Sequence, residues 1–392
     1  MGNEWSCLNG VKIIELANFL PGPYASMLLS SFGAEVIKIE TPGLGDPVRV
    51  MGLPIYEMLN TNKKSVTLNL KSQKGKEIFR QLLSQADALV EGFRPGVMAR
   101  MGLGFDDVKK LNPALVYCSI SGFGQNGPYA DRPGHDLNYL SLSGYFGIPS
   151  QVEDKIARPG IRLSDIAASM FAALSLAIAI VGAKESGKGQ HLDVSIHDAI
   201  SSLVAPMAIM MQDVWGDDIQ QMNHIMPDND IFQTKDGRFF CVATMEDKFW
   251  IALRDLLKSE YPDIANSEYH ERLGRMIHKS AVHQLLSDIF ISKTLKEWEI
   301  VFKDEDIPCC PVLNHKDFLK DPHVKHRGII KEIPGPKTGE KIKQIGFPVK
   351  FSNSLDDIRR KPPTLGEHTA EIISGLGYSK EEIEAFRKDN IV

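Results

Sequence analysis

Two residues could carry out chemistry: a histidine in a loop and an aspartate at the start of an apolar segment. His135 lies in DRPGHDLNYLSLSG, after a Pro-Gly pair that fixes the backbone and before residues apolar enough to be buried. Asp165 stands in RLSDIAASM, directly before 18 residues without a charge. A loop histidine is commonly a surface group, and an aspartate at this position is commonly a helix cap. A carboxylate between an apolar helix and a Pro-Gly loop can also be a nucleophile or a base, so both interpretations stay open.

Basic residues recur where predicted strands end, which is the edge at which α/β sheets bind phosphates. They are Lys38, Lys63, Lys64 and Arg94. Each one alone is typical of a solvated surface charge, but four at one sheet edge could form a cluster for a polyphosphate. The first turn reads ANFLPGPYAS and lacks the dinucleotide fingerprint GxGxxG. It is either an ordinary strand–helix turn or a helix start whose unpaired amides hold a phosphate or an acyl chain.

Alternating strands and helices predict the scaffold that positions these residues. Apolar runs indicate strands at residues 11–16, 34–39, 65–70, 88–91 and 115–120, and helical patterns fall at 24–32, 73–84 and 97–101. This alternation favours an α/β fold with a parallel, doubly wound sheet whose ligand lies at the carboxyl ends of the strands.

The second half of the chain has a different pattern. Residues 166–183 are uncharged, but eight are Ala or Gly and two are Ser, so their transfer energy into lipid is weak. They predict a helix buried in a soluble core, and no membrane partner. Residues 212–230 are polar without a clean period and predict a linker, after which a smaller domain occupies residues 231–325.

Composition limits the function classes. With 392 residues, 43% of them hydrophobic, the chain can bury a large core. The net charge of −5 gives no field that would attract nucleic acid. Five cysteines without a CxxC pair indicate neither a disulfide framework nor a zinc site. These features predict a reduced, cytoplasmic protein without a metal, and the first residues, MGNEWSCLNG, do not resemble a secretory signal.

Several separated stretches resemble the family III CoA-transferases, the CaiB/BaiF group that also contains α-methylacyl-CoA racemase. They are GVKIIELANFLPGPYASMLLSSFGAEVIKIE, NKKSVTLNLKSQKG, EGFRPGVMARMGLG, NPALVYCSISGFGQNGPYADRPGHD, KGQHLDVSIHDA and PPTLGEHTAEIISGLGYS. The resemblance implies a Rossmann-like large domain built from residues 1–211 and 326–392, with the smaller α+β domain inserted between them. It also implies a homodimer of two interlocked, ring-shaped subunits.

The resemblance implies roles for individual residues. His135 matches the catalytic histidine of the racemase branch, Asp165 its second acid/base or the nucleophile of transferases, and Glu246 a glutamate that holds the histidine. Transferases usually carry an aromatic residue at the position of His135, so the racemase branch is favoured. Coenzyme A, the only cofactor expected and part of the substrate, would contact Lys38, Asn60, Lys63, Arg94 and Gly134.

Two reactions and one binding function fit these residues. In the favoured one, a racemase of 2-methylacyl-CoA thioesters, His135 and Asp165 exchange the α-proton on opposite faces, and amides at the start of the Asp165 helix stabilise the enolate oxygen. In the alternative, Asp165 attacks an acyl-CoA, and CoA passes to a second acid through a mixed anhydride and an aspartyl-CoA thioester. A protein that binds acyl-CoA without catalysing a reaction is the third hypothesis.

Two opposing effects would act on the pKa of Asp165. The helix N-terminus would lower this pKa and burial would raise it.

Overall fold

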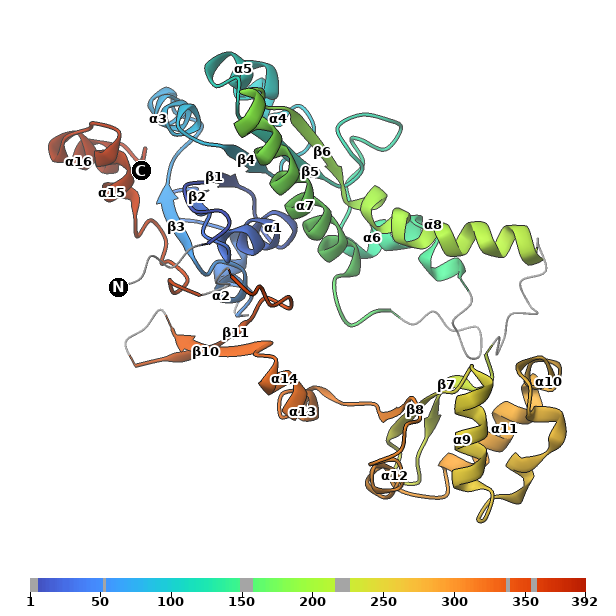
Figure 1. Cartoon of the computed structure of the whole chain (residues 1–392). Coiled ribbons are helices and arrows are strands. Elements are labelled where there is room, and N and C mark those ends of the chain that lie inside the picture. The colour runs from blue at the N-terminus through green and yellow to red at the C-terminus, as the bar shows by residue number, and fades with distance from the viewer. Residues whose placement is uncertain (1–5, 52–53, 149–157, 216–225, 336–338, 354–357) are drawn as a thin grey trace. The chain divides into compact units, whose positions relative to one another are not determined.

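The chain divides into two compact units, and each is described by itself. The structure is a computed structural model that describes all residues except 1–5, 52–53, 149–157, 216–225, 336–338 and 354–357. Unit 1 comprises Met1–Ile148, Ala157–Met210 and His323–Val392, and unit 2 comprises Pro149–Ile156 and Met211–Pro322 (Figure 1). Unit 1 is therefore built from both ends of the chain.

A six-stranded sheet forms the centre of unit 1. Its strands are β1 (Lys12–Leu16), β2 (Glu35–Glu40), β3 (Lys63–Thr67), β4 (Ala88–Glu91), β5 (Val116–Ser121) and β6 (His191–Ser195). They lie in the order β3-β2-β1-β4-β5-β6, and every neighbouring pair is parallel. This is the doubly wound order, in which the chain changes direction between β1 and β4 and leaves a crevice at their carboxyl ends. The predicted α/β class with a parallel sheet is confirmed.

Helices cover both faces of this sheet. One face packs Ile13, Val36 and Val90 against α1 (Pro21–Ser30) and α7 (Leu163–Ser186). The other face packs Ile14, Ile37 and other side chains of the alternate strand positions against α3 (Gln73–Ser84) and the C-terminal helices. The further helices and strands that lie wholly in unit 1 are α2 (Ile55–Leu59), α4 (Val97–Arg100), α5 (Phe105–Leu111), α6 (Asp136–Leu142), β10 (Ile330–Pro334), β11 (Lys341–Ile345), α15 (Thr369–Gly375) and α16 (Lys380–Lys388). Two more helices, α8 (Ile196–Trp215) and α14 (Pro322–His326), lie mostly in unit 1 and cross its limits at Met210 and His323.

Unit 2 is a small α+β unit around an aromatic core. Its antiparallel strands, in the order β7-β8-β9, are β7 (Asn229–Gln233), β8 (Phe239–Ala243) and β9 (Cys309–Pro311). Its helices are α9 (Asp247–Leu257), α10 (Arg272–Ile277), α11 (Lys279–Phe290), α12 (Leu295–Val301) and α13 (His315–Phe318). Phe240, Trp250, Phe290 and Trp298 are all fully or almost fully buried, so this unit has a hydrophobic core of its own.

Two expectations about the middle of the chain need correction. The polar segment 212–230 is not wholly a linker, because α8 continues to Trp215 and β7 begins at Asn229. Only half of the apolar window in α7 is buried within the described structure, and Leu174 and Ile178 are 57% and 63% exposed. By length and composition α7 could cross a membrane, but core helices of soluble proteins pass the same test. The helix is thus amphipathic in its packing although its sequence is apolar all round.

A network of buried charged side chains joins the neighbouring strands β1, β2 and β3. The Glu15 carboxylate of β1 accepts hydrogen bonds from the Lys38 ammonium (2.6 Å) and the Lys63 ammonium (2.8 Å), and all three side chains are completely buried. Lys38 also lies 2.9 Å from the buried Asp46 carboxylate. The Asn60 amide oxygen accepts from Lys63 at 3.0 Å. The polar atoms of the Lys38, Asn60 and Lys63 side chains are thus bonded inside unit 1, which gives no support to their predicted contact with CoA, and that contact stays a prediction.

The pKa values in this network follow from burial and charge. Burial alone would raise the pKa of Glu15, but the two ammonium groups outweigh it and lower the pKa to about 2. Burial lowers the pKa of Lys63 to about 8 in spite of its contact with Glu15. Glu15 is therefore the charge that allows two lysines to be buried together.

We expect Glu15→Gln to destabilise the protein by about 3 to 5 kcal/mol near neutral pH, because it leaves buried ammonium groups without a counter-charge. Glu15 has a lowered pKa in the folded state, so its contribution is complete above its ordinary pKa of 4.5 and is lost as the pH falls toward 2. Urea unfolding of both proteins over that pH range measures the difference. The control is Glu77→Gln, which breaks an exposed pair with Lys74 and should change stability by less than about 0.5 kcal/mol. Equal effects of the two substitutions would contradict this role of Glu15.

Candidate active site

A cavity of about 580 Å³ lies at the carboxyl ends of the strands in unit 1. The loops after β1, β4, β5 and β6 all contribute to it, so it occupies the crevice that the strand order creates. Its lining includes Asn18, Phe19, Gly22, Gly92, Phe93, Arg94, Ser121, Arg132, Gly134, His135, Asp136, Asn138, Tyr139, Asp165 and Ile196. The structure thus brings together His135, Asp165, Arg94 and Gly134 from the predicted site.

Asp136 fixes the start of the helix that carries Asp165. Its Oδ1 atom accepts hydrogen bonds from the backbone N–H groups of Ser164 (2.9 Å) and Asp165 (3.3 Å), in the first turn of α7. The Ser164 hydroxyl donates to the Asp136 carbonyl at 3.2 Å. Asp136 therefore acts as a cap supplied by another helix, α6, and holds Asp165 at the cavity wall.

Burial and the helix cap change two expectations about the start of α7, one about the pKa of Asp165 and one about its backbone amides. The pKa of Asp165 is raised to about 7, mainly by burial and to a smaller extent by the neighbouring Asp136 carboxylate, while Arg162 opposes the rise. The effect of burial therefore exceeds that of the helix N-terminus. The amides of Ser164 and Asp165 are already bonded to Asp136. They are consequently not the donors for a substrate oxygen that the sequence led us to expect.

His135 and Gly134 lie where α6 begins, beside a buried tyrosine. His135 is the exposed N-cap residue of α6, and its backbone N–H donates to the Asn138 side chain at 3.0 Å. A Cβ atom at Gly134 would stand 2.7 Å from the Tyr139 ring, so only glycine permits this approach. The pKa of Tyr139 is raised to about 12 by burial and by Asp165, against the influence of Arg94. Tyr139 is thus a neutral phenol whose pKa both Asp165 and Arg94 influence.

Two arginines give the cavity positive charge. Both Arg94 and Arg132 are exposed lining residues, and the described part of the chain offers neither a carboxylate partner. The Arg132 guanidinium lies over the Tyr129 ring, 5.1 Å from its centroid. Arg94 is positioned by the turn after β4, where the buried Glu91 carboxylate accepts from the Phe93 N–H at 2.8 Å. The cavity therefore has two cations available for anionic groups of a ligand.

Asp136 and Arg132 are the functional candidates that the sequence did not reveal. Asp136 stands next to His135, but its bonding partners are 28 and 29 residues further along the chain. The only signal was an acidic residue at the start of a helical pattern. Arg132 follows an aspartate within a polar loop, where nothing in the pattern distinguishes it from a solvated charge.

Glu246 belongs to unit 2, so its predicted contact with His135 stays a prediction. It is an exposed residue that directly precedes α9. Lys64, the remaining basic residue of the predicted cluster, pairs with Glu35 at 2.8 Å and Glu371 at 2.9 Å. Of the four basic residues at strand ends, Arg94 alone lines the cavity.

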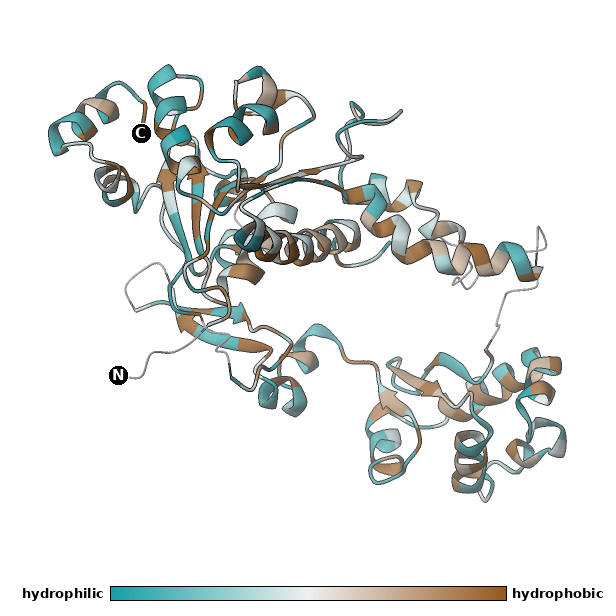
Figure 2. Cartoon of the chain, turned by 45° about the horizontal axis from the view of Figure 1, so that its top comes forward, coloured by the Kyte–Doolittle hydropathy of each residue, from teal (hydrophilic) through white to brown (hydrophobic). Residues whose placement is uncertain are grey.

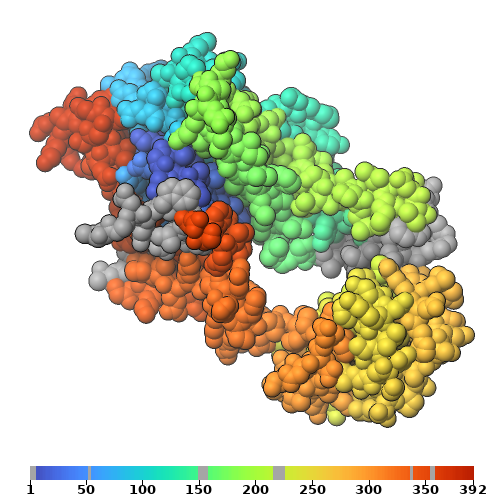
Figure 3. All heavy atoms as spheres, viewed as in Figure 1, coloured from blue at the N-terminus to red at the C-terminus, as the bar shows by residue number. Residues whose placement is uncertain are grey.

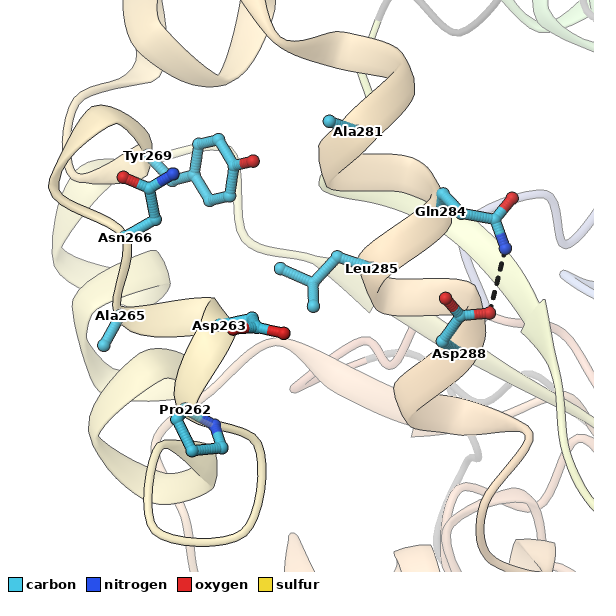
Figure 4. Close-up of a pocket in the computed structure, with 9 residues that line it drawn as sticks. All are labelled: Pro262, Asp263, Ala265, Asn266, Tyr269, Ala281, Gln284, Leu285 and Asp288. Atoms are coloured by element: carbon cyan, nitrogen blue, oxygen red, sulfur yellow. Dashed lines mark hydrogen bonds between the residues drawn. The ribbon is translucent and has the colours of Figure 1, made fainter.

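A second hollow, of about 650 Å³, lies on unit 2 and contains none of the predicted site residues. Figure 4 shows Asn266 and Tyr269 facing the side chains of α11, among which Gln284 donates to Asp288 at 2.9 Å. All of its lining residues are exposed or half-buried. Within the described residues, no group of three or more His, Cys, Asp or Glu side chains could hold a metal ion. The strand-end cavity is therefore the better candidate for chemistry.

Comparison with known proteins decides the family. The model of CoA-transferase family III matches residues 8–369. The chain belongs to this family. It is 33% identical to human succinyl-CoA:glutarate CoA-transferase over 95% of this chain and 86% of the relative. It is 32% identical to cinnamoyl-CoA:phenyllactate CoA-transferase of Clostridium sporogenes, covering 100% and 94% of the two chains.

The fold comparison agrees with this assignment. A solved structure of a CAIB/BAIF family protein from Brucella suis matches with a TM-score of 0.83 and 27% sequence identity, over 95% of this chain and 100% of that one. Membership of family III is thereby confirmed, whereas the favoured closeness to the racemase branch gains no support. Both relatives named above are CoA-transferases, although His135 stands where an aromatic residue was expected of transferases.

We expect Asp136→Asn to lower the pKa of Asp165 from about 7, because the amide keeps an oxygen for the helix cap while the neighbouring negative charge disappears. Carbodiimide modifies protonated carboxyl groups, so the pH at which Asp165 stops reacting reports this pKa. Mass spectrometry of the Asp165 peptide across the pH range provides the measurement.

Asp106→Asn is the matched control, since it removes an exposed carboxylate that does not line the cavity. It should leave the labelling profile of Asp165 unchanged. An unaltered profile in Asp136→Asn as well would show that the two carboxylates are not coupled.

Proposed function

We propose that this protein is a CoA-transferase that moves CoA from an acyl-CoA to a carboxylic acid, with Asp165 as the nucleophile. The observation that carries the proposal is the position of Asp165, which is held by Asp136 in a cavity that also contains Arg94, Arg132 and His135. The family and the relatives support the same reaction. A carboxylate with a raised pKa is a better nucleophile once ionised, and it is ionised at and above about pH 7.

The reaction needs no group beyond Asp165 and the two substrates. The carboxylate attacks the thioester carbon, the C–S bond breaks, and a mixed anhydride forms with release of the CoA thiolate. The thiolate attacks the aspartyl carbonyl carbon, which frees the donor acid and leaves an aspartyl-CoA thioester. An acceptor carboxylate attacks this thioester and forms a second anhydride, and the released thiolate attacks its acyl carbon. The products are the new acyl-CoA and free Asp165.

Racemisation remains the second candidate because His135 and Asp165 share the cavity. A racemase would use them as two bases and would form no covalent bond to Asp165. The two reactions therefore differ in a direct chemical readout.

We expect borohydride, added during turnover of succinyl-CoA with glutarate, to reduce and thus mark Asp165, as mass spectrometry of its peptide would show. Asp165→Asn should lower the transfer rate by a factor of about 10⁴ or more, since no other group replaces a nucleophile. The control Asp106→Asn should keep both the mark and the rate. Deuterium uptake at the α-carbon of a 2-methylacyl-CoA in heavy water, without acceptor and without a mark on Asp165, would overturn the transferase and support the racemase.

We further infer that the acceptor or donor acid carries a second carboxylate, as in the relative that acts on succinyl-CoA and glutarate. This inference is supported by two guanidinium groups in one cavity, because one can meet a phosphate of CoA while the other meets the distal carboxylate. Arg132 is the closer in sequence to His135 and is stacked on Tyr129, which limits its motion.

We expect Arg132→Gln to raise the KM for glutarate by about 10- to 100-fold, which corresponds to the loss of one charge-assisted hydrogen bond. The KM for a monocarboxylate acceptor should change by less than about threefold, because that acid lacks the group that Arg132 would bind. The control is Lys188→Gln, which changes an exposed residue just beyond the C-terminal end of α7 that does not line the cavity. An equal rise for both classes of acid would assign Arg132 to CoA instead.

We also infer the homodimer that the family resemblance implies. Its support is an apolar stripe on α7, formed by Met170, Leu174, Ile178 and Val181, which are all 57–63% exposed. A similar stripe on α8 consists of Leu203, Met207, Met210 and Val214. Figure 2 shows hydrophobic residues along both helices, and Figure 3 shows their atoms, in green and yellow-green, at the surface. Monomeric proteins rarely leave such patches exposed to solvent. Sedimentation of the full chain tests the dimer, and a monomeric result would contradict it.

A further inference from the structure

A pair of cysteines faces each other across two strands of unit 2. The antiparallel register places Cys241 of β8 directly opposite Cys310 of β9. Ladder hydrogen bonds lie two residues away on either side, from the Val312 N–H to the Phe239 carbonyl (3.0 Å) and from the Ala243 N–H to the Pro308 carbonyl (3.0 Å). Because hydrogen-bonded and non-hydrogen-bonded pairs alternate in such a ladder, Cys241 and Cys310 form a hydrogen-bonded pair.

This register places the two cysteines within the range of Cα separations that disulfides span. The Cα atoms of a hydrogen-bonded antiparallel pair are about 5.5 Å apart, and disulfides most often join Cα atoms about 5.5–6 Å apart. Side chains of directly opposed residues project from the same face of the sheet. The Cys310 thiol lies close enough to Cys241 to contribute to the raised pKa of Cys241, and neither cysteine is in a disulfide.

The exposure of the thiols distinguishes this pair from Cys309 and Cys118. Cys310 is exposed and Cys241 is half-buried, so a small molecule can reach the pair. Cys309 lies opposite Val242, packs against the core of unit 2, and has its pKa raised to about 12 by burial. Cys118 is fully buried in unit 1.

We propose that Cys241 and Cys310 form a dithiol site that is oxidised to an intramolecular disulfide by a low-molecular-weight disulfide such as oxidised glutathione. The Cys310 thiolate attacks one sulfur of the reagent, so that a mixed disulfide forms and one thiolate leaves. The Cys241 thiolate then attacks the Cys310 sulfur and displaces the second thiolate. The reagent gains two electrons, both leaving thiolates take up the protons that the cysteines lost, and one protein disulfide results.

The surroundings set the order of these two attacks. Cys310 is the accessible thiol, whereas burial raises the pKa of Cys241, with smaller contributions from Cys310 itself and from Asp230. Cys241 is therefore the resolving thiol, which reacts only once its partner is activated and adjacent. The bond would tie β8 to β9 and enclose helices α9–α12, and so stabilise unit 2 against unfolding.

The experiment treats the full-length protein with oxidised glutathione and maps its cysteines by mass spectrometry without reduction. We expect a linked pair of peptides containing Cys241 and Cys310, two hydrogens lighter than the separate peptides, and no glutathione on either residue. Cys241→Ser should instead retain glutathione on Cys310, because the resolving thiol is absent. Cys7→Ser, which removes an exposed cysteine of unit 1, is the control and should still form the link.

Thermal unfolding provides an independent readout. Oxidation should raise the unfolding temperature of the wild-type protein and of Cys7→Ser, and a reductant should reverse the rise. Oxidation should not raise the unfolding temperature of Cys310→Ser. We expect this variant to fold because Cys310 is exposed. Stable glutathione on Cys310 of the wild type, or a disulfide between two chains, would overturn the proposal. Neither outcome bears on CoA transfer, since the pair is argued without reference to Asp165.

Discussion

The buried carboxylate of Glu15 is the interaction on which the candidate active site depends. It allows Lys38 and Lys63 to be buried, and both lysines also bind the segment that runs from the end of β1 into the first turn of α1. Lys38 donates to the Ala17 carbonyl at 2.7 Å, and Lys63 donates to the Pro23 carbonyl at 2.8 Å. The loop between these carbonyls lines the cavity. The lysines thus contribute to the site by shaping its wall, because hydrogen bonds from buried charges are strong in a medium without water.

The pairing of Asp136 with the start of α7 shows how one contact can serve both structure and chemistry. A cap is needed there because the first amides of a helix have no partner within it. An aspartate supplies the cap and, at the same time, brings a negative charge close to Asp165. A serine or asparagine would satisfy the same amides without this charge. The cost of placing two carboxylates together is therefore consistent with a role in tuning Asp165, beyond what the helix requires.

The sequence predicted the sheet, its strands and the position of Asp165 because these depend on local pattern and chain order. It did not predict the buried partners of Lys38 and Lys63, because a sequence pattern shows that a residue lies near a strand end but does not show which charged side chain it contacts. Lys38 lies within β2 and Lys63 is the first residue of β3, and both side chains are completely buried, whereas Arg94 follows the end of β4 and lines the cavity. The capping role of Asp136 was not predicted for a related reason, because its hydrogen-bonding partners are distant in the chain.

The charges of the cavity distinguish the two reactions better than the identity of one residue does. The histidine at position 135 pointed to proton transfer, which requires two bases and one substrate. Transfer of CoA requires the same cavity to accept the anionic cofactor and a free carboxylate in succession. Arg94 and Arg132, without carboxylate partners among the described residues, meet that requirement. Two arginines fit a cavity that receives a free carboxylate besides the anionic CoA thioester, and in this way they support the proposed transferase although the histidine resembles the other branch.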